Sequence, residues 1–559
     1  MSTRSVFRLQ SLIALWPWAC AASSGFLLAF CFPGWDQGWL VWIALTPLLA
    51  AVRLSPRPAR HAWLRNALLG YVAGLVFFTL TFSWLGSPLA ALFRNPWLVF
   101  LPPLLATYLA LYFAFWAWFI GLFGDASFLF SGRNLRIALL AASAWVAQEW
   151  TRGWLFGGFG WNGLGVALHQ NIALIQAADL AGLPGLSFLV AFANVIAFIT
   201  IRRFVAEVGR TRVRPHWDFS VMMASVVATF AYGVHALMHP IDLPPAAGGD
   251  TVPLRIAAVQ PDIPESDKSD PARVQQIYGR YDALTRTALA WQPQLLLWPE
   301  ASTLTDLFDP DTFGYLKELL SDSDTAFLLG SFLSSPDAGE YNIAACLTRH
   351  GEGVQIYRKM HLVPFGEYIP LRHSFPLFAK IAGELVPGDL RPGTEYTLFH
   401  IGPPPPLRIA PLICFEDTDG DHTRRFVSGE NRGAQLLVNI TNDSWFGRSP
   451  GCEQHLANAL FRAIENRRPL VRAANTGVTC MIDSQGRILH SLLNPDGTPF
   501  LEGILFGTVY VPRNPVFTLY TRYGDWVAFA STAVSLLAIG FRLIRPMGRT
   551  GRMGPIASP

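Results

Sequence analysis

The chain reads LRIAPLICFED over residues 407–417. An apolar run that ends in polar residues is typical of a buried β-strand, so this pattern places Cys414 at a strand end beside Glu416 and Asp417. A thiol exposed next to carboxylates is the environment that a catalytic cysteine requires. The stretch therefore predicts an α/β fold that presents a nucleophilic cysteine.

Two earlier apolar runs end in residues that would assist such a nucleophile. Glu300 closes the run LLLWPE at 295–300, and Lys359 closes VQIYRK at 354–359. A carboxylate can accept a thiol proton, and an ammonium group can stabilise negative charge that develops on sulfur or oxygen. Glu300, Lys359 and Cys414 are thus predicted to form one catalytic site.

The composition indicates that this segment belongs to a membrane protein. Of 559 residues, 51% are hydrophobic and only 15% are charged, which is far from the balance of a soluble domain. A membrane-spanning helix takes on the order of 20 apolar residues. Stretches of this kind lie at 11–32, 37–53, 65–86, 97–124, 136–150, 178–201, 218–239 and 525–543. We therefore expect a polytopic α-helical membrane domain with about eight transmembrane helices.

The placement of arginine predicts the orientation of these spans, because positively charged loops stay on the cytoplasmic side. The opposite short loops hold only Arg94 and Arg152. The segments assigned to the cytoplasm hold Arg4, Arg8, Arg53, Arg57, Arg60, Arg65, Arg133, Arg136, Arg202, Arg203, Arg210, Arg212, Arg214, Arg542, Arg545, Arg549 and Arg552. Both termini are then cytoplasmic, and the long segment before the last span lies on the periplasmic face of a bacterial inner membrane.

That long segment has the pattern of a globular α/β domain, in which short apolar runs alternate with helical ones. Strands are expected at 254–259, 294–298, 326–332, 342–347, 354–357, 407–413, 434–440, 470–474, 479–482 and 504–511, and helices at 271–291, 310–321 and 453–466. The expected domains are a membrane domain at 1–239, a catalytic domain at 240–523, and a last helix with a cytoplasmic tail at 524–559.

Three motifs carry a resemblance to a known family. Residues 298–300 read WPE, residues 357–367 read YRKMHLVPFGE and residues 413–416 read ICFE, and in this order they resemble the Glu-Lys-Cys triad of the nitrilase superfamily. Together with the spans, with GFGWN at 158–162 and with TNDSWFG at 441–447, the chain resembles the bacterial apolipoprotein N-acyltransferases. The resemblance implies a nitrilase-like αββα sandwich beside the membrane helices.

The resemblance also implies an activity and its partners. Enzymes of this family move an acyl chain from a phospholipid, through a cysteine thioester, to the α-amine of a diacylglyceryl-cysteine at a lipoprotein's N-terminus. We accordingly expect a phospholipid donor, a diacylated apolipoprotein acceptor, contact with membrane lipid and a monomeric enzyme. No Gly-rich phosphate loop or metal-ligand cluster is visible, so we expect no cofactor and no metal. The formal net charge of +4 does not argue for nucleic acid.

The chemistry assigns a part to each residue of the triad. A thiol is mostly protonated at neutral pH, so Glu300 is expected to accept the proton of Cys414 as it attacks an ester carbonyl, and Lys359 to stabilise the oxyanion. Glu367 resembles the family's second glutamate and is expected to orient Lys359 or the acceptor.

Two further residues near the nucleophile are expected to be supporting, and two positions depart from the family pattern. Glu416 is expected to hold the loop that carries Cys414. Phe415 stands where many members carry tyrosine, so a hydroxyl is absent there, and Ser269 stands in the region where members often carry tryptophan.

Other positions keep two interpretations. Asn442, Trp445 and Phe446 either form a turn with a hydrophobic plug or line the acyl pocket. Trp161 lies in an aromatic, Gly-rich stretch at 154–162 that indicates an interfacial loop and a substrate contact. His361 has no second histidine at ligand spacing, which favours loop packing over metal binding.

Rival functions are a membrane-tethered amidase or nitrilase that gives the thioester to water, a transporter or receptor with an outer binding domain, and an inactive binding module. A transporter is expected to carry charges along a pathway within its spans. The near absence of such charges in the apolar runs argues against it, and the intact triad argues against an inactive module.

Overall fold

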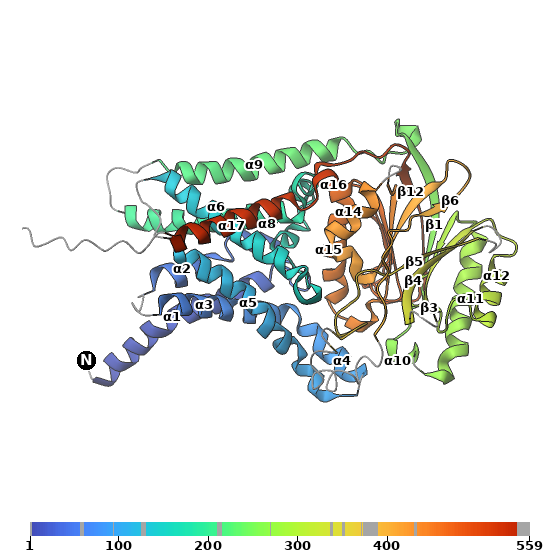
Figure 1. Cartoon of the computed structure of the whole chain (residues 1–559), viewed down its shortest axis with the longest axis horizontal. Helices are drawn as coiled ribbons and strands as arrows, with labels where there is room; N and C mark the ends of the chain where they lie inside the picture. Colours follow the sequence, from blue (N-terminus) through green and yellow to red (C-terminus); the bar gives the residue numbers. More distant parts are fainter. Residues whose placement is uncertain are drawn as a thin grey trace, which may run out of the picture.

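A computed structural model describes residues 3–55, 61–92, 94–123, 130–208, 215–268, 270–335, 339–348, 353–369, 372, 389–429 and 433–544. Long helices form one end of the molecule and a β-sandwich forms the other (Figure 1). The C-terminal helix returns to the helical end beside segments from the N-terminal half of the chain. The architecture therefore confirms a helical part joined to an α/β part.

Helices occupy the expected spans. They are α1 (Thr3–Ala29), α2 (Thr46–Leu54), α3 (Ala62–Thr81), α5 (Leu101–Leu122), α6 (Ser131–Arg152), α8 (Ala178–Glu207), α9 (Trp217–Met238) and α17 (Trp526–Ile544). Among the described residues, five helical segments are long and apolar enough to cross a membrane, namely Ala62–Thr81, Pro96–Leu122, Ala178–Glu207, Trp217–Met238 and Trp526–Leu543. The count of eight spans stays a prediction.

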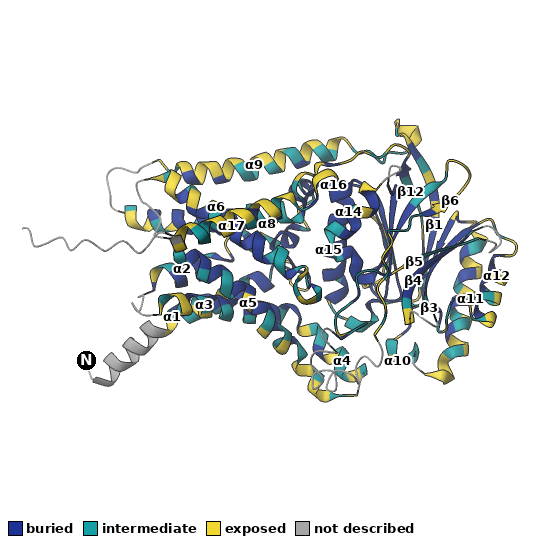
Figure 2. Cartoon of the chain, in the orientation of Figure 1, coloured by how far each residue is buried: buried dark blue, intermediate teal, exposed yellow. Residues whose placement is uncertain are grey.

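The outer faces of these helices are apolar. On α9, Val227 is 58% exposed, and on α17 Leu537 is 74% exposed. Figure 2 shows exposed residues along the length of both helices, whereas the interior of the sandwich is buried. An apolar surface of this extent is stable when lipid covers it, which agrees with the composition of the chain.

Within the described residues, the strands of the α/β part form two six-stranded sheets. The first has the order β12-β1-β2-β3-β4-β5 and the second β11-β10-β9-β8-β7-β6. The strands of the first sheet are β1 (Thr251–Gln260), β2 (Leu295–Leu297), β3 (Ala326–Ser335), β4 (Gly339–Thr348), β5 (Gly353–Arg358) and β12 (Gly503–Pro512). Those of the second are β6 (Phe399–Ile401), β7 (Leu407–Ile413), β8 (Leu436–Thr441), β9 (Leu470–Ala474), β10 (Cys480–Ile482) and β11 (Ile488–Ser491).

Successive residues along the strands of the first sheet face two different hydrophobic cores. On β1, Ile256 faces the core between the sheets, whereas Ala257 packs with the helices α11 (Val274–Ala290) and α12 (Pro310–Leu320). Both faces are buried, which explains why the strands read as continuous apolar runs. The layers are therefore helix, sheet, sheet and helix, which confirms the αββα sandwich.

The second helical layer is shared with the membrane helices. It consists of α14 (Gly420–Ser428) and α15 (Gly451–Asn466), which lie between the second sheet and the helical part (Figure 1). All residues of α15 except Glu453 are buried. An amphipathic surface helix would expose one face to water, so the burial of α15 on all sides reflects contacts with both parts.

Several short elements have no counterpart among the predicted ranges. β6 and β11 are edge strands of three and four residues, too short to show a periodic pattern. α14 reads GDHTRRFVS, and its few apolar residues give no helical stripe longer than one turn. The remaining strands agree with the predicted ranges to within a few residues.

Gly330, on β3, lies close to the strand end that carries Glu300. A Cβ atom at this position would lie 2.5 Å from the Glu300 Cα atom, so Gly330→Ala should displace that strand end. Overpacking of this kind destabilises by about 1–3 kcal/mol. We expect a lower Tm in thermal unfolding and a loss of activity.

Gly314, on α12, is the matched control. A Cβ atom there meets open space among the described residues, and alanine favours a helix by about 1 kcal/mol over glycine. Gly314→Ala should preserve or raise the Tm. Equal Tm values for the two variants would contradict the close approach at Gly330.

Candidate active site

A buried lysine lies between two carboxylates at the centre of the site. The Lys359 side chain is 1% exposed, and its Nζ donates to Glu300 Oε1 at 3.0 Å and to Glu367 Oε1 at 2.9 Å. Burial disfavours the ammonium, but the charges of the two glutamates outweigh burial and raise the pKa of Lys359 well above its ordinary value. The structure thus brings Glu300, Lys359 and Glu367 into one ion-paired group.

Asn342 completes this group, although the sequence analysis does not single it out. Its Nδ2 donates to Glu300 Oε1 at 2.8 Å and to Glu367 Oε1 at 2.9 Å. The backbone N–H of Lys359, directly after β5, also donates to the carbonyl of Asn342 on β4 at 2.9 Å. A single asparagine within an apolar strand has no spacing motif, so only its contacts identify it.

Cys414 lies at the end of β7 in an unusual backbone conformation. Its φ is +51°, a left-handed value that costs a non-glycine residue about 1–3 kcal/mol. The Asn439 side chain, on β8, donates to the Cys414 carbonyl at 3.0 Å. This bond helps to hold the turn that presents the thiol.

The thiol of Cys414 interacts electrostatically with both Glu300 and Lys359. Burial raises its pKa well above the ordinary value, the charge of Glu300 raises the pKa further, and the charge of Lys359 opposes this. The thiol is therefore protonated at neutral pH. A nucleophilic attack then requires a base that removes the proton during the reaction. Glu300 is the carboxylate whose charge raises the pKa of Cys414 most, ahead of Asp443.

Glu416 joins the loops that carry Lys359 and Cys414. Its Oε1 accepts hydrogen bonds from the Met360 and His361 backbone N–H groups at 2.8 and 3.1 Å, and its Oε2 accepts one from the Ile413 N–H at 2.8 Å. Tyr357 donates to the same carboxylate at 2.7 Å. The side chain is fully buried, so it fixes the two strand ends relative to each other.

Phe415 packs against an aromatic loop of the helical part. Its ring stacks on Trp161 at 6.0 Å and on Phe159 at 6.1 Å, and the His361 ring meets its edge at 5.4 Å. Trp161 is 2% exposed, whereas Phe156 of the same loop is 64% exposed. The loop at 154–162 therefore has an outward part and a part that forms a wall beside the nucleophile.

The other predicted contact residues lie at the turn after β8. Asn442 is buried, and its amide donates to Glu265 Oε2 at 2.7 Å while its Oδ1 accepts from Asn475 at 2.9 Å. These contacts support the interpretation of Asn442 as a turn residue.

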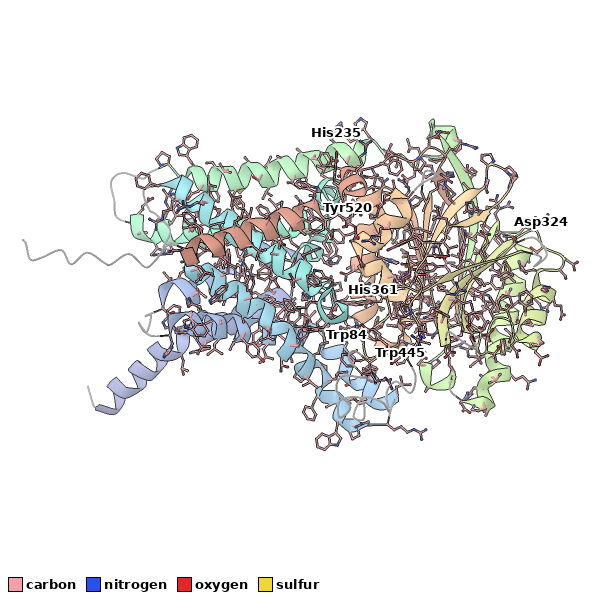
Figure 3. All side chains as sticks on the ribbon, viewed as in Figure 1. Trp84, His235, Asp324, His361, Trp445 and Tyr520 are labelled. Carbon is pink, nitrogen blue, oxygen red and sulfur yellow. The ribbon has the colours of Figure 1, made fainter. Side chains whose placement is uncertain are left out.

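Phe446 and Trp445 belong to the same 3-10 turn but differ in their surroundings. Phe446 meets Trp84 at 4.7 Å and Trp161 at 5.8 Å, so it extends the aromatic wall. Trp445 is half-buried. Figure 3 places Trp84, His361 and Trp445 where the helices meet the sandwich. Ser269 lies outside the described residues.

Behind the nucleophile lies a buried ionic cluster that the sequence analysis misses. Arg472 donates to Asp417 Oδ2 at 2.6 Å and to Asp443 Oδ2 at 2.9 Å, and the His455 ring nitrogens lie 2.9 Å from each of the same carboxylates. All four side chains are buried. Asp417 and Asp443 follow the ends of β7 and β8, so the cluster ties together the turns that bear the site.

Comparisons with known proteins agree with both parts of the chain. Residues 24–196 match a family model described as Apolipoprotein N-acyltransferase N-terminal domain, and residues 255–505 match one described as Carbon-nitrogen hydrolase.

Three similar proteins, each called Apolipoprotein N-acyltransferase, cover most of the chain. The one from Geobacter metallireducens is 36% identical over 93% of this chain and 95% of its own. The one from Rhodopseudomonas palustris is 31% identical over 86% and 87%, and the one from Thermotoga maritima is 28% identical over 92% of each chain.

The electrostatics of the site predict opposite effects of one substitution on two reactions. Glu300→Gln removes a charge that raises the pKa of Cys414, so iodoacetamide should alkylate the thiol faster at neutral pH. Removing the base should slow acylation of Cys414 by an ester by about 10²–10⁴-fold. Mass spectrometry of the modified protein measures both rates.

Lys359→Met is the opposite control in this experiment. It removes the charge that lowers the pKa of Cys414, so alkylation should become slower than in the wild type. Faster alkylation of Lys359→Met, or unchanged acylation of Glu300→Gln, would contradict this arrangement.

The lowered pKa of Glu416 predicts that acid destabilises the fold. Burial alone would raise the pKa of this carboxyl, but the charge of His422 and several hydrogen bonds lower it from 4.5 to about 2. Because the pKa is lower in the folded state, the carboxylate stabilises the fold above about pH 4.5, and this contribution of about 3 kcal/mol is lost as the pH falls toward 2. The Tm should fall from neutral pH to about pH 3 less steeply in Glu416→Gln than in the wild type. Parallel curves would contradict the prediction.

Proposed function

This chain belongs to the apolipoprotein N-acyltransferase family, and we propose that its Cys414 carries the acyl group between a membrane phospholipid and the α-amine of a diacylglyceryl-cysteine at the N-terminus of a lipoprotein. The protein is an acyltransferase whose α/β part has the carbon-nitrogen hydrolase fold. The observation that carries the assignment of residues is the Lys359 ammonium, which is paired with Glu300 and Glu367 and acts electrostatically on the Cys414 thiol.

In the first half of the reaction, Glu300 accepts the proton of Cys414 as the sulfur attacks an ester carbonyl of the phospholipid. Among the described residues, two of the three Lys359 N–H groups bond to carboxylates. The third would stabilise the oxyanion of the tetrahedral intermediate. When the C–O bond breaks, Glu300 returns the proton to the leaving oxygen, which yields a lysophospholipid and a thioester.

In the second half, the neutral α-amine attacks the thioester carbonyl. Glu300 accepts a proton from the attacking nitrogen, and Lys359 again stabilises the oxyanion. The C–S bond breaks, the proton passes from Glu300 to the sulfur, and the amide product leaves. The cycle thus ends with the thiol and the carboxylate restored.

The arrangement in the membrane is part of this proposal. The family and the apolar helices make the chain a bacterial membrane protein. We place the segment 240–523 on the periplasmic face, with 1–239 and the helix of 524–559 in the inner membrane, both termini in the cytoplasm and the enzyme as a monomer. A site held above the outer leaflet of that membrane would meet two lipid-anchored substrates without extracting either.

The test is intact-mass spectrometry of the purified protein after incubation with phospholipid, followed by a diacylated lipopeptide. We expect an acyl adduct on the wild type that hydroxylamine removes, that is absent from Cys414→Ala and that passes to the peptide amine. An adduct that decays to free fatty acid at one rate with or without peptide would instead identify a hydrolase. The absence of any adduct would overturn the covalent mechanism.

A further inference from the structure

Gln454, on α15, holds several segments of the helical part through one carbonyl oxygen. Its Oε1 accepts hydrogen bonds from Trp84 Nε1 at 3.2 Å, Trp161 Nε1 at 3.2 Å and Asn162 Nδ2 at 3.0 Å. These donors lie on two loops, and Trp161 follows Trp84 by 77 positions in the sequence. One side chain of the sandwich thereby joins two loops of the membrane helices.

The amide nitrogen of Gln454 reaches further segments. Its Nε2 donates to the Pro33 carbonyl at 3.2 Å, after α1, and to the Thr81 carbonyl at 3.2 Å, at the end of α3. The residue is 2% exposed. Both N–H groups and the oxygen are used, so the carboxamide is satisfied in this orientation. An unsatisfied buried amide would cost about 1–3 kcal/mol.

The contacts of Gln454 lead to the nucleophile in two steps. Trp161 donates its indole N–H to Gln454 and lies nearly parallel to Phe415, with an angle of 8° between the rings. Phe415 is the residue directly after Cys414. The position of the Trp161 ring therefore determines where the wall beside the thiol stands.

The next residue of α15 supports the same ring from behind. The His455 ring lies 5.1 Å from Trp161 and between Asp417 and Asp443 of the ionic cluster. The Asp443 and Asp417 turns are the loops that follow β8 and β7. Trp161 is thus held on one side by Gln454 and on another by the group that fixes the loop of Cys414.

We propose that Gln454 is a positioning residue for the acyl donor: it holds the Trp161 indole so that the Trp161–Phe415 wall receives the lipid acyl chain beside Cys414. The inference rests on the proposed function, because it assumes a lipid ester as the donor. Gln454 does not contact the Lys359 group in the described structure. Its loss should therefore impair acylation by a lipid and spare the intrinsic reactivity of the thiol.

The experiment compares two reactions of Cys414 in the full-length protein in phospholipid nanodiscs. The first is acylation by the phospholipid, and the second is alkylation by iodoacetamide, which is too small to need the wall. We expect Gln454→Met to acylate at least about tenfold more slowly, because small displacements in a site have effects of this size. Its alkylation rate should stay within about twofold of the wild type.

Gln176 provides a matched control at the same junction. It is also a fully buried glutamine, and its Nε2 donates to the Gln485 carbonyl of the sandwich at 2.8 Å, while it accepts from Arg467 at 2.6 Å. Gln176→Met removes comparable hydrogen bonds between the two parts without touching Trp161. Its acylation rate should remain within about twofold of the wild type.

A double-mutant cycle with Trp161→Phe tests whether Gln454 acts through its hydrogen bond with Trp161. Phenylalanine keeps an aromatic ring but removes the indole N–H that donates to Gln454. If Gln454 acts through that bond, the double variant should be no slower than the slower single variant. Full additivity would overturn the proposal. So would wild-type acylation by Gln454→Met, or an equal loss of acylation and alkylation. A wild type that forms no adduct at all would overturn both this inference and the proposed function.

Discussion

The rest of the site depends on the burial of the Lys359 ammonium. A charge that is removed from water must be paired, because the penalty is several kcal/mol per ion. Glu300 and Glu367 supply that pairing, and Asn342 binds both carboxylates. Burial raises the pKa of Cys414 and keeps it a neutral thiol at rest, the carboxylate charge of Glu300 adds to this effect, and the charge of Lys359 opposes it. Proton transfer during attack, rather than a preformed thiolate, follows from this electrostatic balance.

The geometry of this group is maintained by bonds between strand ends. Glu416 joins the loop after β5 to the end of β7, and the cluster around Arg472 joins the turns after β7 and β8. Since α15 belongs to the outer helical layer of the sandwich and also packs against the helical part, the same turns are held against the membrane helices. The catalytic chemistry and the approach to lipid thereby share one rigid support.

Much of the fold follows from local patterns. The range 407–413 predicted for the strand before Cys414 is that of β7, and the predicted helix at 310–321 differs from α12 by one residue. Such runs are long and apolar because both of their faces are buried. The edge strands β6 and β11 could not be predicted, because three or four residues carry too little periodicity. The apolar stretches predicted the helices, but length and hydropathy alone do not establish how many of them cross the bilayer.

The sequence by itself determined the family, the sandwich and the candidates Glu300, Lys359 and Cys414, because each of these residues closes an apolar run and belongs to a local motif. Tertiary structure alone decided the parts of Asn342, Asn439, Gln454, His455 and Arg472. Their partners are distant in the chain: 293 residues separate Trp161 from Gln454, and 55 separate Asp417 from Arg472. A lone polar residue within a buried element carries no local sequence pattern that identifies its partner. The hydrogen bond or ion pair that stabilises it there forms only when the chain has folded.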